Sequence, residues 1–264
     1  MKKIIALALA LVMCMGLMAA CGASGANEGT TGATESGKAK LVMATNAQFP
    51  PYEFYDEDAI IGIDAEIAGA IAEKLGMELE ISDMEFDSII EAVKGGKADI
   101  GMAGLTVTDE RKEEVDFTVS YATGVQVVIV SEDSAITSVD DLFAEGASHV
   151  IGVQRNTTGD LYSTWDIEEK GLGTVERYSK GADAVQALKT GKVDCVVIDN
   201  EPAKNFVANV EGLKILDTEY AVEEYAAIVS KDNTELFTKV NTALQELIDD
   251  GTVAQIVAKY IPAE

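Results

Sequence analysis

A short segment, residues 103–111, carries groups that could bind an anion. It reads Ala-Gly-Leu-Thr-Val-Thr-Asp-Glu-Arg. Gly104 permits close approach of the backbone, Thr106 supplies a hydroxyl, and Thr108 or its neighbour can cap a following helix. Arg111 would then lie in the first turn of that helix, where a planar guanidinium suits a carboxylate. The alternative is a surface arginine among the charged residues around it.

Two further segments could complete such a site. Asp199 ends the apolar run 196–198, so it either caps a helix starting at residue 200 or pairs with a cation. Residues 152–159 form a strand-to-helix turn that includes Thr158, and the start of that helix offers N–H groups to an anion. A plain capping turn is the alternative for this segment.

Other polar and aromatic residues follow predicted strands. Asn46, Phe49 and Phe86 are candidates for ligand contact, although aromatic residues in such places are more often part of the core. His149 has no obvious nucleophilic partner and is expected to be structural. Cys195 lies in an apolar strand and is expected to be an inert buried thiol. We therefore expect no catalytic residue, no metal and no cofactor.

The elements that position these residues alternate along the chain, which predicts an α/β fold. Apolar runs predict strands, and apolar residues recurring every three or four positions predict helices. The expected strands cover residues 41–44, 79–81, 98–102, 125–130, 150–153, 175–178 and 193–198, and the expected helices cover residues 63–75, 89–93, 161–169, 182–188, 236–247 and 253–260.

An internal repeat indicates two related lobes. Residues 93–104 match residues 188–199, with an apolar residue, Lys, Gly, Lys and Asp at the same spacing. Each copy predicts a helix that ends at glycine and leads into a buried strand. Since ligands bind outside the carboxyl ends of strands in open α/β sheets, Gly104 and Asp199 would face one crevice between the lobes.

Composition narrows the possible partners. The 264 residues include 20 Lys and Arg against 46 Asp and Glu, a formal net charge of −26. Such a charge argues against nucleic acid as a partner, because like charges repel. A single histidine excludes multi-histidine metal centres, and 47% hydrophobic residues are enough for a folded core.

The N-terminus predicts export. Residues 1–20 combine two lysines with an apolar run and small residues, the pattern of a signal peptide. Residues 18–21, Met-Ala-Ala-Cys, resemble a bacterial lipobox, so Cys21 is expected to carry lipid and to anchor the protein on the outer face of the cell membrane. Residues 21–39 are rich in Gly, Ala, Ser and Thr and predict a flexible linker.

Taken together, four segments resemble the bacterial extracytoplasmic binding proteins for polar and basic amino acids, the receptors of ATP-driven importers. The resemblance covers residues 40–261 and is closest to the glutamine-binding branch. It is carried by residues 45–54, 62–64, 103–111 and 193–199.

The resemblance implies a two-lobed, Venus-flytrap fold. Lobe 1 would comprise residues 40–121 and 226–264, and lobe 2 residues 126–222. Residues 122–125 and 223–225 would be the hinges. It also implies a monomer that passes a free L-amino acid to the permease subunits of an ABC importer.

The resemblance also assigns roles to individual residues. Arg111 would bind the ligand α-carboxylate, with the backbone N–H groups of Thr106 and Thr158. Asp199 would pair with the α-ammonium, with the Gly104 carbonyl and the Thr106 hydroxyl. The aromatic rings of Phe49 and Phe86 would flank the ligand side chain.

The kind of side chain on the ligand is predicted from a position at which this chain differs from its relatives. Asn46 stands where lysine-binding and glutamine-binding relatives carry an acid, which favours a neutral polar ligand such as glutamine. Glu53 could instead turn inward and bind a guanidinium, so arginine comes second and cystine third. Rival hypotheses are a cyclohexadienyl-dehydratase-like enzyme on the same fold, and a sensor domain.

Overall fold

The computed structural model describes residues 38–262, and the segment Lys38–Glu264 forms one compact unit. The predicted signal peptide 1–20, Cys21 and most of the linker therefore lie outside the described residues. No helix within residues 38–262 combines the length and the apolar character that crossing a bilayer requires.

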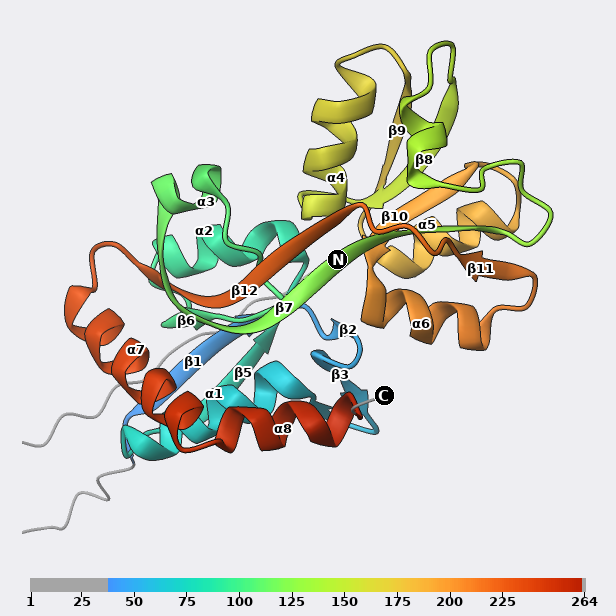
Figure 1. Ribbon diagram of the computed structural model, residues 1–264. Coiled ribbons are helices and arrows are strands. Elements are labelled where there is room, and N and C mark those ends of the chain that lie inside the picture. The colour runs from blue at the N-terminus through green and yellow to red at the C-terminus, as the bar shows by residue number, and fades with distance from the viewer. Residues whose placement is uncertain (1–37, 263–264) are drawn as a thin grey trace, which may run out of the picture. The chain divides into compact units, whose positions relative to one another are not determined.

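A mixed nine-stranded sheet runs through the described residues (Figure 1). Its order is β5-β1-β6-β12-β7-β10-β8-β9, with β11 beside β7. The strands are β1 (Lys40–Thr45), β5 (Glu78–Asp83), β6 (Ile100–Gly101), β7 (Val115–Ser131), β8 (His149–Gln154), β9 (Gly173–Tyr178), β10 (Cys195–Asp199), β11 (Leu213–Ile215) and β12 (Ala221–Ser230).

The two ends of this sheet are separate parallel arrangements. Strands β5, β1 and β6 are parallel to one another, and so are β10, β8 and β9. We call the parts of the chain around these two sets lobe 1 and lobe 2. The long strands β7 and β12 run antiparallel through both lobes and pair with each other between them, at Ala122 with Tyr225 and at Gly124 with Glu223. These pairs lie within the segments predicted as hinges.

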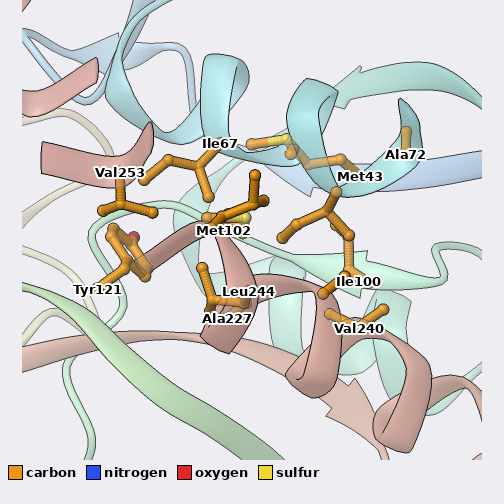
Figure 2. Close-up of a cluster of buried hydrophobic side chains, with 14 of the residues drawn as sticks. Met43, Ile67, Ala72, Ile100, Met102, Tyr121, Ala227, Val240, Leu244 and Val253 are labelled. Carbon is orange, nitrogen blue, oxygen red and sulfur yellow. The ribbon is translucent and has the colours of Figure 1, made fainter. Parts of the chain in front are cut away.

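Helices cover the sheet in each lobe. Those of lobe 1 are α1 (Ile63–Lys74), α2 (Ile89–Lys94), α3 (Asp109–Glu114), α7 (Thr234–Asp249) and α8 (Thr252–Tyr260). Those of lobe 2 are α4 (Thr158–Ser163), α5 (Gly181–Lys189) and α6 (Asn200–Asn209). Apolar side chains from α1, α7 and α8 meet those of β1 and β6, among them Ile67, Leu244 and Met43 (Figure 2). This packing holds the β1 and β6 ends, which carry site residues, in place.

The internal repeat of the sequence is a repeat of structure. Helix α2 ends at Lys94 and α5 ends at Lys189, the same position in the two copies. Beyond each helix a glycine adopts a positive φ, 68° at Gly96 and 70° at Gly191. Each glycine N–H donates to the carbonyl three residues earlier, and the N–H of the next residue donates to the carbonyl one residue before that one, the geometry that ends a helix at a left-handed residue.

The aspartate of each copy fixes the following strand to its neighbour. Asp99 Oδ2 accepts from Val42 N at 2.8 Å, and Asp194 Oδ2 accepts from Val150 N at 2.7 Å. The backbone N–H of each aspartate returns a bond to the same residue's carbonyl, at 2.8 Å in both cases. The repeated Asp thus has the same role in both lobes, and the prediction of two related sheets is confirmed.

Two local predictions need correction, and several elements were not predicted. The helix expected at 161–169 is α4 followed by a π-helical turn, η3 (Thr164–Glu168), because the turn begins already at Thr158. The strand expected at 125–130 is the end of the longer β7. Strand β12 was not predicted, nor was a small sheet of β2 (Gln48–Phe49), β3 (Glu53–Asp56) and β4 (Ala59–Ile61).

Candidate functional site

A cavity between the lobes collects the predicted site residues. It contains about 410 Å³ of space not filled by atoms, part of it open to solvent. All eight predicted residues line it: Asn46, Phe49, Phe86, Gly104, Thr106, Arg111, Thr158 and Asp199. The sequence therefore located the residues of one cavity, and their roles in binding stay predictions.

The Arg111 guanidinium is held in the cavity wall by backbone carbonyls from both lobes. Arg111 lies in the first turn of α3, whose cap Thr108 accepts from Arg111 N at 3.1 Å. Nη1 donates to Thr106 O at 2.9 Å and Nη2 donates to Asn156 O at 2.9 Å. The guanidinium lies 5.6 Å from the ring centre of Phe86, in the short helix η1 (Phe86–Ser88). The alternative of a surface arginine is wrong, since the residue is 5% exposed.

This cation has no acid bound to it. Within residues 38–262 the ion pairs of arginine involve Arg155 and Arg177, and none involves Arg111. Burial lowers the pKa of Arg111 to about 10, against the opposing charge of Glu223. The group is therefore a cation at neutral pH, and its planar fork can bind a carboxylate.

Asp199 supplies the opposite charge from lobe 2. It stands at the N-cap position of α6, yet its side chain makes no capping bond, so the alternative of a simple cap is wrong. Instead Oδ2 accepts from Gln126 Nε2 at 2.5 Å and Oδ1 accepts from the Tyr225 hydroxyl. Burial, and then the charge of Glu223, raise the pKa of Asp199 well above its usual range. A cationic group in the cavity would restore its charged form.

A buried network on the hinge strands supports this pair of charges. Glu223 Oε2 accepts from Thr106 Oγ1 at 3.0 Å, from Thr158 Oγ1 at 3.1 Å and from Gln126 Nε2 at 3.1 Å. Thr106 belongs to lobe 1 and Thr158 to lobe 2, so one carboxylate joins groups from both sides of the cavity. Tyr225 adds its hydroxyl to Asp199 from the same strand β12.

The opposite end of the cavity is closed by two amides. Gln154 Nε2 of lobe 2 donates to Asn46 Oδ1 of lobe 1 at 3.1 Å, and Asn46 Nδ2 donates to Met84 O at 2.8 Å. Phe49 packs beside Gly104, which has φ +54°, and a Cβ there would stand 2.9 Å from the Phe49 ring. A side chain at position 104 would therefore push this ring into the cavity.

Glu53 is an acid among the residues that line the cavity. It is completely buried at the start of β3, and no N–H or hydroxyl within the described part of the chain donates to either of its carboxyl oxygens. Burial, and then the charge of Asp64, raise the pKa of Glu53 well above its usual range. Burial also raises the pKa of Asp64 to about 6, although Gly104 N donates to it at 2.8 Å. Such a pair of acids attracts a cationic ligand group.

Sequence reasoning missed the supporting residues Gln126, Glu223 and Tyr225. They lie in strands whose other residues are largely apolar and buried, so a polar side chain in such a run was the available signal. It was not decisive, because the partners of these residues are 26 to 117 positions away in the chain.

Comparisons with known proteins agree with this geometry. Residues 41–263 match the family model described as bacterial extracellular solute-binding proteins, family 3. The chain is 34% identical to the "Arginine-binding extracellular protein ArtP" of Bacillus subtilis (strain 168), with 100% of both chains covered. The chain belongs to this family.

Two other relatives are similar over most of their length. A "Probable histidine-binding protein" of Neisseria gonorrhoeae is 32% identical, covering 100% of this chain and 97% of the relative. An ancestral arginine-binding protein solved with arginine is 37% identical, with a TM-score of 0.78 over 85% of this chain and 99% of that one. An ancestral arginine-binding protein solved with glutamine is 36% identical, with a TM-score of 0.78 over 86% of this chain and 99% of that one.

Membership in this family confirms the two-lobed α/β fold predicted from the sequence. The family is extracellular by its description, which agrees with the predicted export. The relatives reported above carry the names of binding proteins.

The crossing strands leave no room for a side chain at Gly124, which gives a prediction for stability. A Cβ there would stand 2.2 Å from the Tyr225 hydroxyl and 2.3 Å from its ring. We expect Gly124→Ala to lower the free energy of unfolding by about 2–3 kcal/mol, since a rigid buried ring has to move. Urea denaturation measures this loss. Thr123→Ala, at the exposed neighbouring position, is the control. Equal stability of the two variants would contradict the packing described.

Proposed function

We propose that the protein binds free L-arginine in the cavity between its lobes and delivers it to an ABC-type amino-acid importer. A neutral polar amino acid such as glutamine, or cystine, is the alternative ligand of the same kind of receptor. The observation that carries the proposal is Glu53, a buried carboxyl on the cavity wall to which no donor of the described chain is bound.

The charges of the cavity support an amino acid as the ligand. Arg111 offers an unpaired guanidinium to an α-carboxylate, and Asp199 offers a carboxylate to an α-ammonium. Both groups are buried, so each ionic hydrogen bond to a ligand forms away from bulk water and is strengthened. A zwitterion matches both charges, whereas a simple anion or cation would leave one of them without a partner.

Glu53, the third charged group of the cavity after Arg111 and Asp199, favours arginine over glutamine as the ligand. In the sequence, Asn46 in place of an acid favours a neutral ligand, whereas Glu53 favours a ligand with a guanidinium. Asn46 already bonds to Gln154 and Met84, so its amide is committed to the protein. Glu53 shares a hydrogen bond with the neighbouring acid Asp64 but accepts from no N–H group of residues 38–262, and a guanidinium offers it two parallel N–H groups. The names of the relatives, which include arginine-binding proteins, support the same order.

Delivery to a membrane importer is part of the same proposal. The lipid on Cys21 would hold the receptor beside the permease subunits, and closure of the lobes on the ligand would give the permease a shape to recognise. An enzyme on the same fold is disfavoured, since the cavity groups described above serve as charge partners for a zwitterion and the relatives are named as binding proteins.

Removing either central charge should abolish tight binding. We expect Arg111→Ala to weaken L-arginine binding by at least about 2 kcal/mol, because a ligand carboxylate would be buried without a partner. Asp199→Asn should have a comparable effect through the ammonium. Isothermal titration calorimetry measures both. Lys112→Ala, which removes an exposed cation one residue further along α3, is the control. Near-native affinity in Arg111→Ala would sink the proposal.

Glu53→Gln separates arginine from glutamine. The change keeps the shape of the side chain and removes its charge, so we expect arginine affinity to fall by about 10- to 100-fold, the value of a charge-assisted hydrogen bond. Glutamine affinity should change by less than about threefold. Calorimetric titration of both ligands checks the difference. An equal change for the two ligands would mean that Glu53 does not contact the ligand side chain.

The same residue predicts a pH dependence. The pKa of Glu53 is raised in the free protein by burial and by the charges of Asp64, Asp199 and Asp83, and a bound guanidinium would lower it. Arginine binding should therefore release a proton, and arginine affinity should fall as pH drops below the raised pKa. Asp199 adds a similar loss for every amino acid.

The ratio of arginine to glutamine affinity isolates the contribution of Glu53. This ratio should decrease as pH falls in the wild-type protein, and it should be independent of pH in Glu53→Gln. Titrations of both ligands across the acidic to neutral range check this. A constant ratio in the wild-type protein would contradict the assignment.

A further inference from the structure

Glu223 stands at the point where the chain crosses between the lobes. It lies on β12 opposite Gly124 of β7, it is 4% exposed, and it belongs to the segment predicted as a hinge. Three donors reach the same oxygen, Oε2, from three different elements: the hydroxyls of Thr106 and Thr158 and the amide of Gln126. A single hinge carboxylate therefore connects groups of both lobes.

These contacts fix the positions of the hydroxyl hydrogens. A carboxylate oxygen accepts hydrogen bonds, and each threonine hydroxyl has one hydrogen to donate. The hydrogens of Thr106 and Thr158 are therefore both directed to Glu223. The two hydroxyl oxygens lie 3.5 Å apart, and neither has a hydrogen left for the other. Both residues line the cavity, so their oxygens remain there as acceptors.

The amide of Gln126 is oriented in the same way. Its Nε2 donates to Asp199 Oδ2 and to Glu223 Oε2, which uses both of its hydrogens. Because both partners are acceptors, the nitrogen has to face them, and Oε1 points elsewhere. This Oε1 atom is buried, has no donor within residues 38–262, and belongs to a residue that lines the cavity. It is packed against α4, since a Cβ at Gly159 would stand 3.2 Å from it, so it is not an acceptor open to the cavity.

We propose that Glu223 is a positioning residue that makes the hydroxyls of Thr106 and Thr158 into hydrogen-bond acceptors for the α-ammonium of the ligand. This inference rests on the proposed amino-acid ligand and extends it, since Glu223 does not line the cavity. An ammonium carries three N–H donors and no acceptor, so a wall of fixed acceptors beside Asp199 selects it over a neutral hydroxyl or amide. The hinge strand thus contributes to recognition of the ligand as well as to movement.

The test compares Glu223→Met with Glu224→Met. Methionine is similar in length and removes the acceptor, and Glu224 is the exposed neighbour that accepts from Ser120 Oγ at 3.0 Å. Two ligands are titrated: L-arginine, and δ-guanidinovalerate, which is arginine without its α-amino group. We expect Glu223→Met to weaken arginine by about 10- to 100-fold and δ-guanidinovalerate by less than about threefold. Glu224→Met should change neither ligand by more than about threefold.

Glu223→Gln is the conservative rescue. Its carbonyl oxygen can replace Oε2 as the acceptor. On a logarithmic scale of arginine affinity, Glu223→Gln should therefore lose at most half as much as Glu223→Met. Three results would each overturn the proposal. The first is an equal loss of affinity for the two ligands in Glu223→Met, the second is no loss for arginine, and the last is a Glu223→Gln variant that binds arginine as weakly as Glu223→Met. The first result would show a structural role alone, and the last would show that charge is what matters.

The test can still be made if Glu223→Met does not fold or if arginine is not the preferred ligand. If Glu223→Met does not fold, Thr158→Val is used, and it should weaken arginine but leave δ-guanidinovalerate within about threefold. If the wild-type protein prefers another amino acid, the arginine assignment fails, and the same comparison is made with that amino acid and its deaminated form. If it binds no amino acid at all, both proposals are overturned.

Discussion

The site depends on a buried guanidinium that forms no ion pair with any acid of residues 38–262. Arg111 is 5% exposed, and both of its cavity-side bonds go to backbone carbonyls, one from each lobe. Removing a cation from water is costly unless an anion compensates for it. Glu223 is the largest favourable charge that acts on it, but it forms no ion pair with it. A ligand carboxylate between the lobes would supply that anion, as the proposed function requires.

The same contacts make binding and closure one process. Arg111, Gln154 and Arg155 each reach across the cavity to the other lobe, at Asn156, Asn46 and Asp87. Two lobes joined by crossing strands can exchange between open and closed forms. A ligand shifts such an equilibrium only by its preference for the closed form. Because Arg111 and Asp199 come from opposite lobes, a zwitterion contacts both charges only when the lobes meet.

The sequence predicted those parts of the protein that depend on local pattern. The repeated helix-to-strand connection, in which Asp99 and Asp194 have the same role, predicted the two lobes. The cap at Thr108 predicted that Arg111 lies in the first turn of a helix. The network under the cavity could not be predicted, because Gln126 and Glu223 meet their partners only after the two hinge strands cross. Strand β3 has residues on both faces, and its place in a sheet decides whether an acid such as Glu53 points inward. The fold and the cleft could therefore be predicted from the sequence, whereas the proposed specificity rests on a side chain whose orientation only the structure gives.

One measurement tests the central claim most directly: mass spectrometry of the amino acid that remains bound through gentle purification, followed by calorimetric competition between L-arginine and L-glutamine on the wild-type protein. The account predicts that arginine is retained and that it displaces glutamine. Retention of a neutral amino acid that arginine cannot displace would contradict it, because the acid at position 53 would then have no cationic partner.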